Sequence, residues 1–416
     1  MSATGVAPVP FPTERTLFDP PPELGEYRRT EPIRPLQYPD GEVGWLVTSH
    51  ALARQVLGDR RLSMKGSPRF IARPGEQRPD REDLREQMDE VMTPSRAGTF
   101  INMDAPEHIR FRRALAGRFS VKYVAGLAEV IEEIVAGRLD AMANAPQPVD
   151  LQAEFAVPVA LETICYVMGI SIQPEWNSIL EVMEVDPPLQ EDLLGDYRAF
   201  RDAMAAEVQK LREHPNEGLL SFLLQESQLT EEEVIGVGQF LVVAGHHTTS
   251  SMLGLSVLVL QQNREDWEAV VADPEGFPDM LEELVRYINV LQLAPFTRTA
   301  IEDLEVGGVQ IKAGQRVQVS AAAANRDPDF LTRPDEFDPK RDVTGHLAFG
   351  HGVHQCLGQH LARLELRIAL TRLVERFGDL RPAVPVAELE VNPGNYPGHG
   401  VPELPVVWDT AEGDSP

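Results

Sequence analysis

The sequence contains two cysteines in contrasting surroundings, and one of them is placed to do metal chemistry. Cys356 lies in the segment 349–358, FGHGVHQCLG, where glycine permits a tight loop and close approach of the backbone to a flat ligand. A helix is expected to follow at 357–377, and the free N–H groups at its start favour the thiolate form of the cysteine. Cys165 lies in the apolar helical stretch LETICYVMGI, which predicts a buried, inert thiol. Cys356 is therefore the candidate metal ligand.

The residues of the loop leave three interpretations open. A cysteine thiolate on haem iron pushes electron density toward oxygen and favours O–O cleavage. Zinc is a second metal to consider, because cysteine and histidine at close spacing form zinc sites. In the third interpretation, the segment is a glycine-rich turn that happens to hold a cysteine. The zinc site would draw on Cys356, His351, His354 and His360.

A second candidate site lies in the middle of the longest predicted helix. Thr230 and Glu233 form a capping box at its start, and the helix is expected to run to about Gln262, a length of about 45–50 Å. So long and apolar a helix must pass through the protein interior. Its centre nevertheless reads AGHHTTS at 244–250, a polar patch with a glycine. Such conflicts with helix chemistry mark functional sites, often with a distorted turn.

Two pairs of polar residues elsewhere have helical spacing. Glu283 and Arg286 stand three residues apart, and His108 and Arg112 stand four apart, so each pair shares one helix face. Taken alone, pairs of this kind are usually surface ion pairs or an ordinary polar face.

The elements that must position these residues are mainly helices. Helical periodicity is found in most of the chain, with strands expected at 41–49, a hairpin at 304–321 and a short β region at 391–407. No repeat or linker divides the middle, so we expect a single domain over 1–416, with flexible ends at about 1–22 and 410–416. The clearest of the helical segments, besides the two already given, are 106–126, 159–168, 196–212 and 278–290.

Composition excludes several classes of protein. The net charge of −27 over 416 residues argues against a nucleic-acid-binding protein, which needs an extended basic surface. The N-terminus lacks the basic start and apolar core of a signal peptide. The longest apolar stretches, such as 255–260, are too short to cross a bilayer. A cytoplasmic protein with no membrane partner is expected.

The segment 349–358 resembles the haem-binding signature of the cytochrome P450 family, Phe-x-x-Gly-x-His-x-Cys-x-Gly, with every fixed position filled. Four separated motifs occur in the family's order, so the resemblance covers essentially the whole chain. It implies a soluble bacterial-type P450 with a mainly α, triangular-prism fold and a small β portion. It also implies a haem b with Cys356 as its iron ligand, contacted in the same loop by Phe349, Gly350 and Gly358.

The sequence AGHHTT resembles the oxygen-binding motif of the family, Ala-Gly-x-acid-Thr-Thr. The resemblance implies that Thr248 helps deliver protons to oxygen and that Ala244 and Gly245 leave room beside the haem. His247 departs from the pattern, because the family carries Asp or Glu there. Two interpretations stay open: His247 relays protons, which a histidine can do near neutral pH, or it points away from the haem and is simply hydrogen-bonded.

The resemblance also assigns roles to the two helical pairs. Its haem propionates are contacted by four donor groups, a task suited to charge-assisted hydrogen bonds. These groups are His108, Arg112, Arg298 and His354. A buried structural network is implied for Glu283, Arg286 and Arg341, the last following Phe337 in PDEFDPKR.

The function implied is a haem-thiolate monooxygenase that hydroxylates or epoxidises a hydrophobic small molecule. Secondary metabolites, especially polyketides and macrolides, are the substrate class expected by analogy. The alternatives are non-monooxygenase oxidation, such as coupling or peroxide-driven chemistry, and a non-catalytic haem- or metal-binding protein. The pocket is expected to draw on parts of 64–100, 174–197, 239–248, 290–296 and 395–396, with an apolar wall from Leu291, Leu293, Ala294 and Phe296.

Electrons are expected from NAD(P)H through a ferredoxin reductase and a ferredoxin, with the P450 as a monomer. A local basic patch on this acidic chain could steer an acidic electron donor. The alternative is propionate binding together with an ordinary basic helix. The patch consists of Arg110, Arg112, Arg113, Arg118 and Lys122, with no acidic residue among them.

Overall fold

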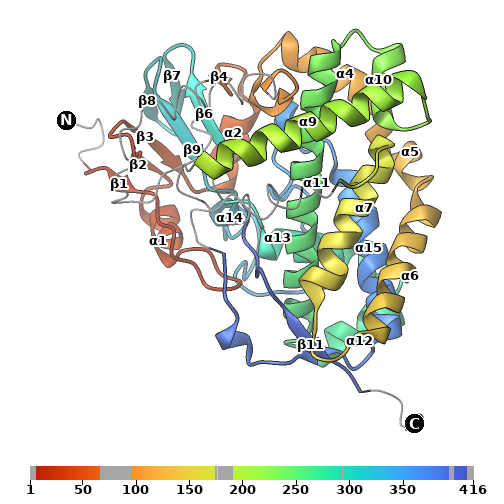
Figure 1. Ribbon diagram of the computed structural model, residues 1–416. Coiled ribbons are helices and arrows are strands. Elements are labelled where there is room, and N and C mark those ends of the chain that lie inside the picture. Colours follow the sequence, from red (N-terminus) through yellow and green to blue (C-terminus); the bar gives the residue numbers. More distant parts are fainter. Residues whose placement is uncertain are drawn as a thin grey trace.

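The computed structural model describes residues 6–65, 96–173, 176, 191–292, 295–392 and 398–409. Helices dominate these residues, and most of the β structure lies at one side of the molecule (Figure 1). This arrangement confirms the mainly α fold with a small β portion.

The long central helix is α11 (Glu231–Leu260), which runs through the helical part of the molecule (Figure 1). Its capping box is present: the Glu233 amide donates to Thr230 Oγ1 at 3.2 Å, and the Thr230 amide donates to Glu233 Oε2 at 2.8 Å. All residues from Thr249 to Leu260 are buried, as the apolar sequence predicts. The helix is continuous through 244–250, so the distorted turn considered there is not found.

Helices α7, α9, α10, α13 and α15 pack against α11, and their apolar residues form the main core with it. Cys165 on α7 is buried, and burial raises the pKa of its thiol to about 12, which confirms the prediction of an inert thiol. The helices are α1 (Pro22–Thr30), α2 (His50–Gly58), α4 (Glu107–Ala116), α5 (Val121–Ala125), α6 (Ala128–Asn144), α7 (Val157–Met168), α9 (Glu191–Glu213), α10 (Leu219–Glu226), α12 (Arg264–Ala272), α13 (Phe277–Ile288), α14 (Ala321–Ala324) and α15 (Gln359–Arg376).

The main sheet has six strands in the order β1-β2-β3-β9-β6-β4. β2 pairs antiparallel with β3, β3 pairs parallel with β9, and β6 pairs antiparallel with β9. A second sheet has the order β10-β11-β5, and β7-β8 is a separate hairpin. The strands are β1 (Val9–Pro10), β2 (Ile33–Gln37), β3 (Val43–Val47), β4 (Leu62–Ser63), β5 (Val149–Asp150), β6 (Thr297–Ala300), β7 (Leu304–Val306), β8 (Val309–Ile311), β9 (Arg316–Val319), β10 (Arg381–Pro382) and β11 (Pro405–Val407).

Three predicted segments differ in detail. The segment 106–126 is not one helix but α4, a 3₁₀ turn η2 (Gly117–Phe119) and α5, because Ser120 caps a new helix. Within 304–321, only β7 and β8 form the hairpin. The chain then turns at Gly314 and β9 joins the main sheet instead. Within 391–407, the described residues contain β11 and a single bridge between Leu291 and Gly398.

The predicted network of Glu283, Arg286 and Arg341 is present and joins α13 to the segment before the Cys356 loop. Glu283 and Arg286 are fully buried and share two hydrogen bonds of 2.6 and 2.7 Å. Arg341 lies 3.5 Å from the Glu283 carboxylate. Arg286 also donates to the carbonyls of Asn325 and Pro334. The helix therefore holds a long irregular segment in place.

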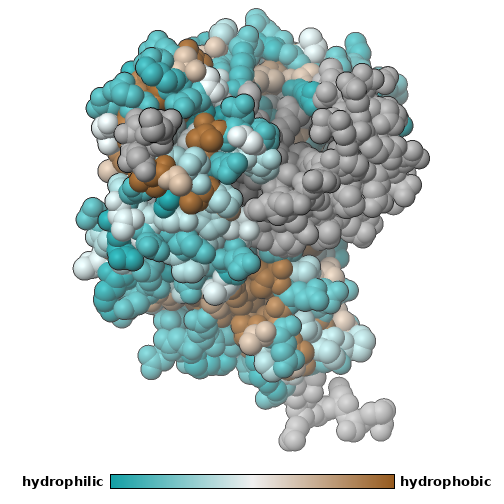
Figure 2. Space-filling view, turned by 90° about the vertical axis from the view of Figure 1, so that its left-hand side faces the viewer, coloured by the Kyte–Doolittle hydropathy of each residue, from teal (hydrophilic) through white to brown (hydrophobic). Residues whose placement is uncertain are grey.

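The surface in Figure 2 is mostly hydrophilic, with apolar side chains gathered in small patches. Within the described ranges, no helix combines the length and apolar character needed to span a membrane.

Candidate active site

The Cys356 loop doubles back on itself before α15 begins. The amide of Cys356 donates to the Phe349 carbonyl at 2.8 Å. Gly350 and Gly352 have positive φ angles of 71° and 74°, a conformation that residues with a Cβ rarely adopt. The predicted tight loop is therefore confirmed, and its backbone path requires these glycines.

Opposing electrostatic effects act on the Cys356 thiol. Burial raises its pKa, whereas the N–H groups of Gly358 and Gln359 and the positive charges of Arg112 and Arg363 lower it. These two amides lie at the start of α15, where helix N–H groups have no partner within the helix. A cation bound to the sulfur would supply the remaining positive charge and keep the sulfur deprotonated.

Four basic side chains from distant parts of the sequence converge near the Cys356 loop: His108 and Arg112 from α4, Arg298 from β6 and His354 from the 3₁₀ turn η4 (Gly352–His354). The rings of His108 and His354 have centroids 4.0 Å apart. Arg298 is only 3% exposed, and burial lowers its pKa to about 10. Burial, together with the charges of His108 and Arg298, lowers the pKa of His354 to about 3. A buried guanidinium such as that of Arg298 requires an anionic partner.

Asp104 is the carboxylate that the sequence analysis missed in this cluster. Its negative charge raises the pKa values of His108, Arg298 and His354 against the larger effect of burial. Its side chain accepts hydrogen bonds from the Met64 amide, at 2.9 Å, and from the Ser63 hydroxyl. In the sequence, the feature that could have identified Asp104 is its position four residues before His108. One carboxylate does not balance the two guanidinium charges of Arg112 and Arg298.

The residues of the cluster fit a haem. Its two propionates would bring two negative charges to these buried donors, in charge-assisted hydrogen bonds. His354 Nδ1 is buried and has no hydrogen-bond partner among the described residues, so a donor or acceptor position stands unused there. The thiol of Cys356 would supply the iron ligand.

The central helix α11 carries the second predicted group of site residues. The Thr248 hydroxyl donates to the carbonyl of Ala244 at 2.8 Å, one turn back along the helix. A Cβ on Gly245 would lie 3.0 Å from the Ile164 side chain of α7. The small size of Gly245 therefore serves close packing of α7 on α11, and its expected role of leaving room beside the haem stays a prediction.

His246 is buried and His247 is half-buried on α11, and the two rings contact different surroundings. A Cβ on Gly398 would lie only 2.6 Å from Cδ2 of His247, so the imidazole rests directly on the Gly398 backbone. Burial lowers the pKa of His247 to about 4, which makes the ring neutral at physiological pH. His246 is 2% exposed, and both of its ring nitrogens lack a partner within the described part of the chain.

The sequence and the fold match known proteins along nearly their whole length. Residues 277–385 match the family model described as cytochrome P450. Cytochrome P450 105C1 of a Streptomyces species is 37% identical over 97% of this chain and 100% of its own length. The chain belongs to the cytochrome P450 family.

Two further P450 relatives have names that state an activity. Pentalenic acid synthase of Streptomyces avermitilis is 36% identical over 97% of this chain and 98% of its own length. The mycinamicin VIII C21 methyl hydroxylase of Micromonospora griseorubida, solved with mycinamicin VIII bound, has a TM-score of 0.85 and 29% identity. It covers 96% of this P450, and the match spans 100% of its own chain.

Membership of the family makes this P450 a haem-dependent monooxygenase. It takes electrons from a redox partner and acts on a small substrate. The zinc interpretation finds no support, because no three His, Cys, Asp or Glu side chains in the described ranges are grouped as a metal site.

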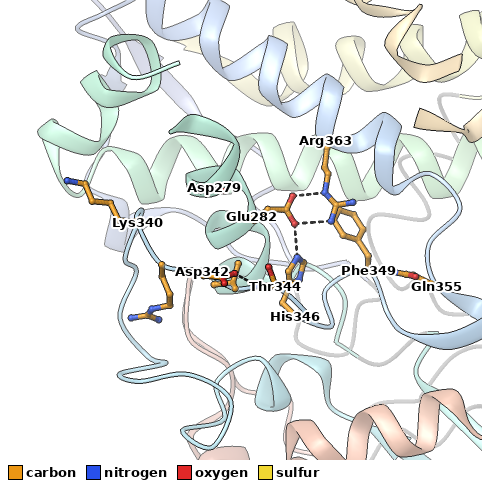
Figure 3. A pocket seen from close by; sticks show the side chains of 12 residues that line it. Asp279, Glu282, Lys340, Asp342, Thr344, His346, Phe349, Gln355 and Arg363 are labelled. Atoms are coloured by element: carbon orange, nitrogen blue, oxygen red, sulfur yellow. Dashed lines mark hydrogen bonds and ion pairs between the residues drawn. The ribbon is translucent and has the colours of Figure 1, made fainter. Parts of the chain in front are cut away.

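A pocket of about 500 Å³ lies behind the Cys356 loop of the P450 (Figure 3). Glu282 on α13 accepts two hydrogen bonds from Arg363 on α15, of 2.5 and 2.8 Å, and lies 3.0 Å from His346 Nε2. The Arg363 guanidinium stacks over the Phe349 ring, 4.4 Å from its centroid. None of Glu282, His346 and Arg363 was singled out from sequence, where each belongs to an ordinary charged or polar stretch.

The predicted substrate-contacting segments are only partly described. Most of 64–100 and 174–197, together with Leu293, Ala294 and 395–396, lies outside the described residues. Leu291 pairs with Gly398 in a β-bridge. Phe296 is buried, and its ring lies next to Gly350 of the Cys356 loop. Phe296 therefore supports the loop as well as the expected apolar wall.

Proposed function

We propose that this P450 uses haem b to hydroxylate or epoxidise a hydrophobic secondary metabolite of the polyketide or macrolide type. The convergence of four basic groups near Cys356, of which His108 and Arg298 are buried, carries the proposal, because it suits a planar ligand with two carboxylates and a thiolate-bound metal. The names of the mycinamicin hydroxylase and pentalenic acid synthase support a secondary metabolite as the substrate, and the polyketide or macrolide class rests on analogy.

Cys356 is the proposed axial ligand, and His108, Arg112, Arg298 and His354 are the proposed propionate partners. When bound, haem with a thiolate ligand supplies activation of dioxygen by electrons and protons, for insertion of one oxygen atom into an organic substrate. The protein's contribution is to offset part of the cost of burial for the thiolate, through the α15 amides and the nearby arginines. The Cys356 loop, with Phe349, Gly350 and Gly358, shapes the surroundings of that sulfur.

Thr248, on α11, is the residue proposed to deliver protons to oxygen. Its hydroxyl donates to the Ala244 carbonyl, so the oxygen keeps two lone pairs with which to accept. Such a hydroxyl can accept a hydrogen bond from water and can pass on its own proton while the water replaces it. His247, the preceding residue, has a neutral ring. To take part in proton transfer, it would accept a proton on one ring nitrogen and release one from the other.

A ferredoxin, reduced by a ferredoxin reductase, is the proposed electron donor, and the P450 is proposed to act as a monomer in the cytoplasm. The basic patch supports a docking role in part. Arg110 is paired with Glu233, Arg118 donates to Tyr123 and the Glu217 carbonyl, and Arg112 faces Cys356. Arg113 and Lys122 are exposed. These two side chains are therefore the proposed contacts for an acidic partner.

The test is the absorption spectrum of the reduced, carbon monoxide-bound protein, compared with Cys356→Ser. We expect a strongly red-shifted Soret band of the thiolate type in the natural protein and its loss in the variant. Cys165→Ser is the matched control and should keep the band, because that thiol is buried in α7. No haem, or a histidine-type band in all three proteins, would overturn the proposal.

A further inference from the structure

A pair of glycines faces the central helix beside Thr248. Gly398 and Gly400 are two residues apart, so in an extended segment their backbones face the same side. His247 and Ser251 are four residues apart and share one face of α11. A Cβ on Gly398 would lie 2.6 Å from His247 Cδ2, and a Cβ on Gly400 would lie 2.7 Å from Ser251 Oγ. We call Gly398 and Gly400 the glycine notch.

The glycine notch is held in place from its opposite side. His399, between the two glycines, donates its amide to the Val290 carbonyl at 2.6 Å, and its Nε2 lies 2.7 Å from the Leu17 carbonyl. Gly398 also pairs with Leu291 in a β-bridge. The segment 398–400 therefore lies between α11 and residues 290–291. It contacts α11 at His247, the residue before Thr248.

Because the contact at the glycine notch is so close, the size of residue 247 sets the distance between α11 and segment 398–400. The spacing of the two glycines matches the spacing of His247 and Ser251, since two extended residues span about 6.7 Å and four helical residues span about 6 Å. Side chains on α11 can therefore enter the notch in register. Only a residue without a Cβ lets the segment lie this close, and a large ring at 247 fills the space that the missing Cβ leaves.

We propose that His247 is a positioning residue whose imidazole, seated in the glycine notch, sets the distance between α11 and segment 398–400. Through that distance it fixes one wall of the substrate pocket and so which substrates fit. The last step rests on the proposed function, because it takes the space beside Thr248 as the substrate pocket. In this role the ring works by its shape, which the Asp or Glu typical of the family does not share.

A double-mutant cycle on the haem-loaded protein tests the seating of the ring. Gly398→Ala should lower the midpoint of thermal unfolding by a few degrees, because the new methyl group overlaps the imidazole. In His247→Ala/Gly398→Ala, the methyl group occupies the vacated space, so most of that loss should be recovered. The matched control is His246→Ala/Gly398→Ala, in which the two effects should simply add. Additive effects in both double variants would overturn the proposal.

A binding measurement tests the consequence for the pocket. Imidazole and 4-phenylimidazole are titrated by the absorption change on haem binding, in the natural protein, His247→Ala and His246→Ala. Removing the ring at 247 should raise the affinity for the larger probe relative to the smaller by several-fold, while His246→Ala leaves the ratio unchanged. An unchanged ratio in His247→Ala would overturn the proposed effect on the pocket.

The outcomes also separate this inference from the proposed function. If Gly398→Ala does not fold alone, recovery of a folded protein only in the His247→Ala background supports the seating of the ring. If neither background rescues folding, an unchanged probe ratio in His247→Ala overturns it and a shifted ratio supports it. Absence of the thiolate-type carbon monoxide band in the natural protein would instead overturn the proposed function, while the unfolding cycle could still be measured on the protein as purified.

Discussion

At the scale of single residues, the charge around Cys356 is set by side chains on several elements. Burial acts against the thiolate, and α15 amides and two arginines act for it. Arg112 comes from α4, whereas Arg363 comes from α15 and is fixed by Glu282 and by stacking on Phe349 (Figure 3). A fixed positive charge near the sulfur stabilises the more reduced state of a bound metal.

Replacing Arg363 by glutamine should therefore lower the reduction potential of the haem iron by tens of millivolts, because a positive charge is lost and Glu282 keeps its negative one. Potentiometric titration followed by the Soret band measures this shift. Arg363→Lys should retain most of the potential. Arg372→Gln on the same helix is the control, since Arg372 is exposed and paired with Glu132 and Glu375. An unchanged potential in Arg363→Gln would contradict the argument.

At the scale of elements, the junction of α13 with the segment leading to the Cys356 loop depends on one buried carboxylate. Glu283 accepts two hydrogen bonds from Arg286 and one from the Asp338 amide. Neither Glu283 nor Arg286 has any exposed side-chain surface. Removing one charge of such a pair leaves the other buried without compensation, which costs more than the pair itself contributes.

Glu283→Gln should accordingly reduce the free energy of unfolding by about 3–5 kcal/mol and weaken retention of haem. Denaturant unfolding of the purified protein gives the first quantity, and transfer of haem to apomyoglobin gives the second. Glu336→Gln is the matched control, because Glu336 forms an exposed ion pair with Arg333 and should change stability by less than about 1 kcal/mol. Equal effects of the two substitutions would rule out the special role of Glu283.

His246 on α11 couples the stability of the central helix to pH. Burial, then the neighbouring His247, lowers its pKa from 6.5 to about 3. As the pH falls below 6.5, the unfolded chain therefore takes up a proton that the folded chain does not, and the folded state loses stability until the pH reaches about 3. Both ring nitrogens also lack a hydrogen-bond partner among the described residues, which adds a cost at any pH.

His246→Leu should therefore stabilise the protein, by about 2 kcal/mol more at pH 5 than at pH 8. Urea unfolding at the two pH values measures the difference between variant and natural protein. The exposed His214 provides the control, and His214→Gln should show no such dependence. A difference that stays constant between pH 8 and pH 5 would show that His246 is protonated in the folded state or bound to another group.

At the scale of the whole molecule, an acidic chain displays a local basic region. The net charge is −27, yet Arg113 on α4, the helix that carries His108, and Lys122 on α5 are exposed. Such local contrast steers oppositely charged partners over about one Debye length and is weakened by salt.

Charge reversal of both residues, Arg113→Glu/Lys122→Glu, should slow electron transfer from reduced ferredoxin about ten-fold at low ionic strength, with the difference shrinking as salt is added. Stopped-flow reduction of the ferric protein in carbon monoxide-saturated buffer, followed by the appearance of the carbon monoxide band, measures the rate. The control is Arg29→Glu, an exposed arginine on α1. Equal slowing by the control would point to net charge alone, and an unchanged rate in the double variant would exclude docking at this patch.

Features that depend on residues close together in the chain could be predicted from the sequence alone. The capping box, the apolar run and the glycines predicted α11 and the Cys356 loop, because helix caps, helical periodicity and positive φ angles are local properties. The resemblance of the loop to the P450 signature added the haem and its partners. The same local reasoning placed the β7–β8 turn but not the path of β9, whose partners β3 and β6 lie outside that segment.

Contacts between residues far apart in the sequence could be identified only from the three-dimensional structure. His108 meets His354 across 246 positions, and His247 meets Gly398 across 151 positions, and no local pattern records either contact. Glu282 and Arg363 each sit in ordinary charged helices until the packing of α13 on α15 brings them together. The cause is physical: a side chain's neighbours within a helix follow from its spacing, whereas its partners across the molecule follow from how helices and sheet pack. Whether His247 relays protons or points away from the haem was open in the sequence for this reason, and its contact with Gly398 is what the tertiary structure adds.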